Sequence, residues 1–308
     1  MKNLLYFLIF PGFLFTAICG LVASWVDRKL TARLQWRVGP PWYQPFIDIL
    51  KLLGKETIVP KGASKLTFLS APLVSLASVT LVSTIVWMVD LNPSKSFVGD
   101  IIVVIYLLTI PSIGLMIGGF ASRNPLASLG ASREMKLILS YELPFLLAII
   151  VPIIKTSGAI RIGELLTYQL GNGLIVKNLS GMIAFFVVIF VLQAKLSLAP
   201  FDIPEAETEL MSGPIVEYSG APLAIIKLTK AMMLFTLPIF LIVMFLGGIS
   251  TDGINIVWGI SKYIGLLALV SIIKNTNPRL RVDQALKFFW GPLTVLAIIA
   301  VVLACMGL

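Results

Sequence analysis

The chain of 308 residues contains no histidine and only two cysteines, Cys19 and Cys305. The two cysteines form no CxxC pair, so the sequence predicts neither an iron–sulfur cluster nor a zinc site. Without histidine, the chain cannot ligate haem through an imidazole, and it lacks the usual proton carrier near neutral pH. Any protons that move through this chain must therefore be carried by carboxylates, lysines and water. Any electrons must stay on other proteins.

Charged residues are also scarce, at 13% of the chain, whereas hydrophobic residues make up 58% and the mean hydropathy is +0.98. This composition excludes a soluble globular protein. Long apolar segments with few charges are typical of membrane-spanning helices. The sequence therefore predicts an all-α, polytopic membrane protein in which residues 1–308 form one transmembrane domain. About eight spans are expected, at Leu4–Val26, Leu66–Val89, Ile101–Phe120, Leu137–Ile154, Met182–Leu198, Pro222–Leu246, Val257–Ile273 and Phe288–Gly307.

The net charge of +9 does not indicate nucleic-acid binding, because most of the 24 Lys and Arg residues lie in alternate loops between the expected spans. The positive-inside rule places loops 27–65, 121–136, 199–221 and 274–287 in the cytoplasm and both termini outside the cell membrane. The first span has no small-residue cleavage site and leads into a charged loop, so we expect it to be retained rather than removed as a signal peptide.

The first cytoplasmic loop contains a predicted amphipathic helix at Pro45–Lys55. Asp48, Lys51 and Lys55 share one face of this helix, and apolar side chains occupy the other. Two interpretations remain open: a helix that lies in the membrane interface, or the rim of a cavity that faces a peripheral partner. Before this helix, Arg37 is followed by a rigid Gly-Pro-Pro, which could shape the wall of a pocket or anchor the loop to anionic lipid heads.

Acidic residues are concentrated in one segment, Pro200–Glu217, and no Lys or Arg lies between Lys195 and Lys227. The run from Asp202 to Glu205 predicts a helix start with Asp202 as its N-cap, which would place Asp202, Glu205 and Glu209 on one face. Repulsion and partial burial would then favour proton uptake by these carboxyls. A solvated loop that binds a basic partner is an equal alternative. The five acids are Asp202, Glu205, Glu207, Glu209 and Glu217.

The charged residues inside expected spans include Glu142, Lys227 and Lys230. Charges within the bilayer are costly and often functional. The sequence favours a proton relay in which Lys230 pairs with Glu142 or Glu217, and the two prolines that follow Glu142 could open the helix to water. The alternative is a structural ion pair that holds two helices together.

Three blocks of this sequence together resemble the H subunit of respiratory complex I, which is subunit 1 in mitochondria. The first runs from Asp27-Arg-Lys to Lys55-Glu56. The second is Pro200-Phe-Asp-Ile-Pro-Glu-Ala-Glu with Glu217-Tyr-Ser-Gly. The third is Pro278-Arg-Leu-Arg-Val-Asp283 with Trp290. The blocks occur in the family's order and span the chain, and the family's eight helices agree with the expected number.

Departures from the quinone-reducing members point to one branch of this superfamily. The block from Ser122 to Glu142 lacks their alanine-rich ALRAxAQ run. It is more similar to the anchor subunit of energy-converting membrane-bound [NiFe] hydrogenases and related sulfane sulfur reductase complexes. Gly39-Pro-Pro and Gly213-Pro-Ile likewise differ from the usual GPN and G(F/Y)N. In this branch ferredoxin is the electron donor.

The resemblance implies a non-redox membrane subunit that joins a peripheral redox arm to an ion-translocating membrane arm. Its implied partners are hydrogenase-like large and small subunits, an iron–sulfur subunit and antiporter-like membrane subunits. Those partners would hold the iron–sulfur clusters and, in a hydrogenase, a nickel–iron centre, while this chain holds no cofactor. The implied coupling residues are Glu142, Asp202, Glu205, Glu207, Glu209 and Glu217, with Lys227 and Lys230 as the intramembrane cations. The implied junction residues are Arg37, Asp48, Lys51, Arg279, Arg281 and Asp283.

Three alternatives remain: a quinone-site subunit of NADH:quinone oxidoreductase, a stand-alone transporter or channel, and a purely structural anchor. Purification separates the second from the others, because a transporter would be active alone, whereas a complex subunit copurifies with iron–sulfur proteins.

The sequence generates one test of the acidic residues. Glu142→Gln or Glu209→Gln should reduce ion pumping by the complex and leave electron transfer through the isolated peripheral arm intact. Unchanged pumping in all the carboxylate variants would exclude these residues from the coupling mechanism.

Overall fold

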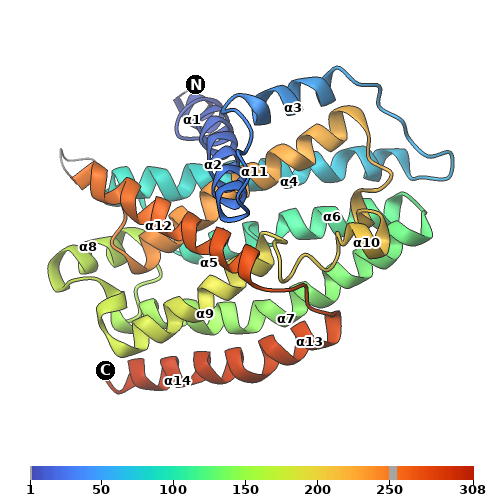
Figure 1. The fold of residues 1–308 in the computed structure, drawn as a ribbon. Coiled ribbons are helices and arrows are strands. Elements are labelled where there is room, and N and C mark those ends of the chain that lie inside the picture. Colours follow the sequence, from blue (N-terminus) through green and yellow to red (C-terminus); the bar gives the residue numbers. More distant parts are fainter. Residues whose placement is uncertain (1, 250–254) are drawn as a thin grey trace.

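The computed structural model describes residues 2–249 and 255–308 as a bundle of helices that run side by side (Figure 1). The α-helices are α1 (Lys2–Leu8), α2 (Phe13–Leu34), α3 (Gln44–Leu53), α4 (Lys65–Leu91), α5 (Asp100–Leu107), α6 (Ile110–Ala121), α7 (Pro125–Lys155), α8 (Ile162–Asn172), α9 (Leu179–Lys195), α10 (Glu207–Leu210), α11 (Gly220–Phe245), α12 (Asn255–Thr276), α13 (Val282–Phe288) and α14 (Thr294–Cys305). Short 3₁₀ turns lie at Pro93–Lys95, Ile175–Lys177 and Gly213–Ile215, and a π-helical turn at Phe289–Leu293 joins α13 to α14.

Within the described residues, 7 helical segments are long and apolar enough to cross a membrane, and α9 is a shorter apolar helix. The prediction of an all-α, polytopic membrane protein is therefore confirmed. The predicted amphipathic helix is also present, as α3, Gln44–Leu53.

The first span differs from its prediction because it is broken into α1 and α2. Pro11 cannot donate a backbone hydrogen bond, and the break leaves its carbonyl free. The hydroxyl of Ser83 on α4 donates to that carbonyl at 3.3 Å, and Thr16 also donates to it at 3.3 Å. After the break, α2 continues to Leu34, eight residues beyond the predicted end of the span.

The fourth span begins much earlier than predicted, so most of the predicted cytoplasmic loop 121–136 is helix. Asn124 caps α7 by accepting a hydrogen bond from the backbone of Leu126 at 2.9 Å, and Pro125 occupies the first turn. Arg133, Glu134 and Lys136 consequently lie on α7. The hydropathy profile placed these residues in a loop, because charged residues lower the local mean hydropathy whether or not the backbone is helical.

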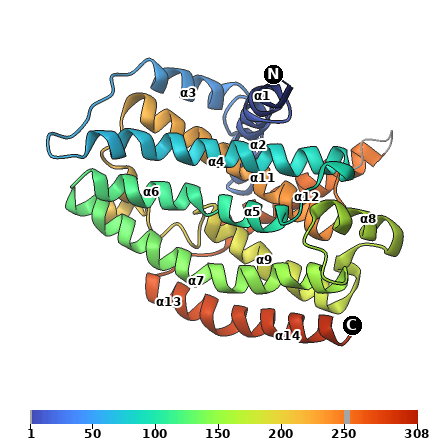
Figure 2. The same cartoon turned by 180° about the vertical axis from the view of Figure 1, so that it is seen from behind.

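Helix α11 forms the centre of the bundle, where it packs against α2, α4 and α3 (Figure 2). Gly20 on α2 permits close approach, since a Cβ there would lie 2.6 Å from the carbonyl oxygen of Ala231 on α11. About two turns further along α2, buried Asp27 accepts hydrogen bonds from Ser271 at 2.8 Å and Lys274 at 2.9 Å, which fix α12 in place. Helices α7, α9 and α14 pack against one another as a second group.

The two ends of the bundle differ in chemistry. Figure 1 places α10 and the connection from α3 to α4 at one end, and α8 and the C-terminus at the other. The acidic segment and the long basic loop therefore share one end, as the predicted loop assignment requires.

The contact at Gly20 gives a test of the packing between α2 and α11. Gly20→Ala should push the two helices apart and lower the free energy of unfolding by about 1–3 kcal/mol. The melting temperature of the purified complex measures this change. Gly265→Ala on α12 is the matched control, because nothing lies within 4 Å of a Cβ there. Equal melting temperatures for the two variants would contradict this account of Gly20.

Candidate functional site

The acidic segment does not start a helix at Asp202, which corrects the prediction from the sequence. Residues 199–206 form bends and turns instead, and Phe201 and Ile203 are both buried. The backbone of Leu280 donates to the carbonyl of Pro200 at 3.1 Å and holds this run against the segment before α13. Within the acidic segment, α-helix forms at Glu207–Leu210 and a 3₁₀ turn at Gly213–Ile215.

Three acids of this segment are bound by three different cations rather than grouped on one face. Asp202 pairs with Arg279 at 2.8 Å, Glu209 pairs with Arg133 at 2.5 Å, and Glu205 pairs with Lys230. All three cations lie outside the acidic segment. The predicted mutual repulsion is thus replaced by attraction to α7, α11 and the segment before α13.

The local electrostatics differ between these carboxyls. Burial raises the pKa of Asp202, and the charge of Arg279 opposes that rise. The hydrogen bond and charge of Arg133 lower the pKa of Glu209, whose side chain is exposed. Glu209 therefore stays ionised at neutral pH, and acidification through its lowered pKa removes the attraction between α10 and α7.

The predicted partners of Lys230 are also corrected. Lys230 bonds Glu205, whereas Glu142 pairs with Lys195 at 3.1 Å. Glu217 accepts a hydrogen bond from the side chain of Asn124. Glu142 and Glu217 therefore have different neighbours, and neither pairs with Lys230.

A vestibule of about 570 Å³ lies beside the acidic segment, between α2 and α11. Its wall combines apolar side chains with three acids and three bases. The charged members are Asp27, Arg28, Glu205, Glu207, Lys227 and Lys230.

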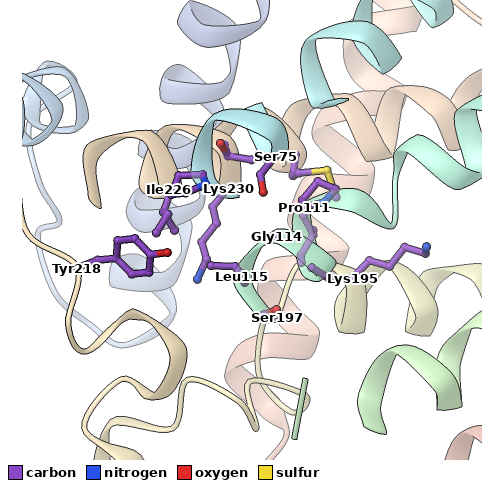
Figure 3. A pocket seen from close by; sticks show the side chains of 14 residues that line it. Ser75, Pro111, Gly114, Leu115, Lys195, Ser197, Tyr218, Ile226 and Lys230 are labelled. Carbon is purple, nitrogen blue, oxygen red and sulfur yellow. The ribbon is translucent and has the colours of Figure 1, made fainter. Parts of the chain in front are cut away.

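A much smaller inner cavity of about 30 Å³ adjoins the vestibule (Figure 3). Leu196, Ser197, Tyr218 and Lys230 line both spaces. The inner cavity has room for about two water molecules and for nothing larger. In Figure 3, Lys195 and Lys230 extend from this cavity in different directions. The ammonium groups bind Glu142 and Glu205 respectively, so the cavity lies between two lysine–glutamate pairs.

Lys195 is the more deeply buried of the two lysines, with 1% of its side chain exposed, compared with 33% for Lys230. Its ammonium lies 4.4 Å from the ring centroid of Phe145 and 5.1 Å from that of Tyr141. Such aromatic faces attract a desolvated cation. Among the described residues, only Glu142 forms an ion pair with Lys195, so each of the two charges is stabilised by the other.

Sequence reasoning missed Lys195 and Glu134. Lys195 ends α9, and its place at the edge of an expected loop concealed its burial. Glu134 lies on α7 with 2% of its surface exposed. Its flanking charges, Arg133 and Lys136, made the stretch resemble a solvated loop. A helical projection of α7 from Asn124 would have placed Glu134 near the face of Tyr141.

The predicted junction residues differ in their exposure and in their partners. Arg37, Lys51 and Asp283 are exposed, and Asp48 on α3 pairs with Arg28 of the vestibule at 3.0 Å. Burial opposes ionisation of Asp48, but the hydrogen bonds from Arg28 and Gln44 lower its pKa. A second hollow of about 300 Å³ is lined by Arg133, Asp202, Glu209, Arg279, Arg281 and Asp283.

The described part of the chain contains no group of three or more His, Cys, Asp or Glu side chains that could hold a metal ion. The chemistry that this arrangement offers is the binding and transfer of protons by carboxyls, lysines, hydroxyls and water.

The buried pair gives a direct test. Lys195→Met leaves Glu142 without its cation and should lower the free energy of unfolding by about 3 kcal/mol. Adding Glu142→Gln in the same chain should restore most of that loss, because no unpaired charge remains. Thermal melting of the purified complex measures both variants, with exposed Lys177→Met as the control. A double variant less stable than Lys195→Met would contradict this account of the pair.

The whole chain is similar to known membrane proteins. The sequence profile of the family described as NADH dehydrogenase matches residues 6–305. The H subunit of the NADH-quinone oxidoreductase of Thermomicrobium roseum is 35% identical, with 93% of this chain and 91% of that protein covered. The NADH-ubiquinone oxidoreductase chain 1 of Dictyostelium citrinum is 34% identical, with 97% and 94% covered.

A solved structure of the membrane-bound sulfane sulfur reductase, an archaeal respiratory membrane complex, contains a chain of the same fold. The two chains superpose with a TM-score of 0.88 at 29% sequence identity, covering 99% of this chain and 100% of the other. The resemblance seen in the sequence is thus confirmed: this chain belongs to the NADH dehydrogenase family, the family of the H subunits of complex I-like membrane complexes.

Proposed function

We propose that this chain is the non-redox membrane subunit of a ferredoxin-linked respiratory complex of the membrane-bound hydrogenase or sulfane sulfur reductase type. It joins the peripheral redox arm to the ion-translocating membrane arm and couples electron transfer to proton or sodium-ion translocation. One observation carries this proposal. Two lysine–glutamate pairs, Glu205–Lys230 and Glu142–Lys195, flank a cavity that holds only water-sized molecules.

The order of these groups describes a path for protons. The vestibule brings water to Glu205 and Lys230 at the end of the bundle that carries the acidic segment. The inner cavity follows, and Lys195 lines it while binding Glu142. A change in charge or position of the acidic segment would alter the field at Lys230, and from there the energy of a proton at Glu142.

The acidic segment provides the mechanical link to the peripheral arm. Asp202, Glu205 and Glu209 each bind a different element, so movement of the segment changes three ion pairs together. The exposed junction residues would contact hydrogenase-like large and small subunits and an iron–sulfur subunit, which hold the clusters. Antiporter-like subunits would lie beside the chain in the cell membrane, with both of its termini outside.

A quinone site is the second candidate, because the vestibule is large enough to admit a quinone head group and two relatives are named as quinone oxidoreductase subunits. Six charged side chains line this space, which is costly beside an apolar ring. The narrow inner cavity would in any case keep a quinone on the outer side of Lys230.

The test compares variants of the intact complex in proteoliposomes. Glu205→Gln and Lys230→Met should each reduce the number of ions moved per electron to less than half, because each removes one end of the outer pair. The control is Glu164→Gln, which changes an exposed acid on α8 that pairs with Arg161 at 3.5 Å. Full pumping by both outer-pair variants would refute the proposal, whereas inhibition by quinone analogues would favour the second candidate.

A further inference from the structure

Glu134 is a buried acid that no described cation binds directly. It lies on α7 with 2% of its surface exposed and forms no ion pair among the described residues. The Ser112 hydroxyl on α6 lies within hydrogen-bonding reach of its carboxyl, and the charged groups that act on it are Glu205 and Lys230. Every other acid of the predicted pathway has a cation, an amide or open water beside it.

Such surroundings favour the neutral form of a carboxyl. Burying an ionised carboxylate without a partner costs far more free energy than keeping the proton on it. Lys230 would favour the ionised form, but Glu205 binds that lysine and its own negative charge opposes ionisation of Glu134. In the resting arrangement Glu134 is therefore a proton donor.

A second unusual group lies beside it on the same helix. Tyr141 is 1% exposed, and its hydroxyl has no hydrogen-bond partner among the described residues. Ser112 lies near this hydroxyl as well as near Glu134, and Tyr141 experiences the charges of both Glu134 and Glu142. Ser112 also lines the inner cavity, as does Lys195, which pairs with Glu142.

We infer that Glu134 carries the resting proton of this pathway and passes it to Glu142 through Ser112, Tyr141 and the water of the inner cavity. This inference rests on the proposed function and adds a proton-carrying residue to it. Each hydroxyl or water accepts one proton and donates another, so none ends with a charge. Glu134 becomes a carboxylate, Glu142 becomes a neutral acid, and a proton from the vestibule later restores Glu134.

The acidic segment would control this transfer through Lys230. While Glu205 holds Lys230, the lysine's charge is neutralised and Glu134 keeps its proton. When the segment moves and Glu205 leaves, Lys230 can stabilise the carboxylate of Glu134, and the proton moves toward Glu142. Movement of a loop at the end of the bundle is thereby converted into proton release inside it.

The experiment uses the intact complex in proteoliposomes, with ion translocation per electron and infrared difference spectra as its two measurements. During turnover the wild type should gain the C=O stretch of protonated Glu142 and lose that of protonated Glu134, which appears as a negative band. Glu134→Gln should abolish that band and reduce translocation to less than half. Glu134→Asp keeps a carboxyl and should retain part of both signals. Glu164→Gln should change neither.

The outcomes separate this inference from the function on which it rests. If Glu134→Gln keeps the band and full translocation while Glu205→Gln loses translocation, the role of Glu134 is wrong and the proposed function stands. If all these variants pump fully, both are wrong. Copurification of the peripheral subunits shows that each variant complex has assembled. If Glu134→Gln prevents assembly, the spectrum of the Glu134→Asp complex decides, because an unshifted carboxyl band would overturn the inference.

Discussion

The cost of placing charge in hydrocarbon determines how this chain is arranged around its acids. An unpaired buried charge destabilises a protein by several kcal/mol, so each charge must find an opposite charge, strong hydrogen bonds or a proton. In this chain, three acids are stabilised by ion pairs with different lysines. Glu142 pairs with the buried ammonium of Lys195, Glu205 pairs with Lys230, and Asp27 pairs with Lys274. Because these partners come from distant parts of the sequence, the ion pairs also fix which helices are neighbours.

This requirement explains why the membrane spans could be predicted from the sequence but the pairing of charges could not. Hydropathy identifies long apolar helices because only helices satisfy their own backbone in a bilayer. Hydropathy carries no information on how α7 is rotated about its axis relative to α9, and this rotation determines that Glu142 contacts Lys195. The acidic segment shows the same limit. Its Asp-x-Pro-Glu pattern fits a helix start locally, but residues 201–206 form bends and turns in which Phe201 and Ile203 are buried.

Family motifs identified the functional segment, which the periodicity of the sequence could not do. The residues of the Pro200–Glu217 block are enough to identify the acidic segment and to indicate its place in a respiratory complex. Sequence analysis did not identify Lys195 and Glu134 as site residues, because both lie close to predicted boundaries between spans and loops. At such boundaries, charge and hydropathy do not distinguish the end of a helix from a loop. The fold places both beside the inner cavity or its lining residue Ser112, where small volume selects water over any larger molecule.

Asn124 joins the acidic segment to the helix that carries the buried acids. Its carbonyl oxygen accepts from the backbone of Leu126 at the start of α7, and its amide nitrogen donates to Glu217. A primary amide carries its acceptor and its donor on two different atoms of one short side chain. Aspartate could still cap the helix but would repel Glu217, and serine could cap it without reaching that far. One side chain therefore links the first turn of α7 to the last acid of the loop, so a displacement of the loop would be transmitted to that helix.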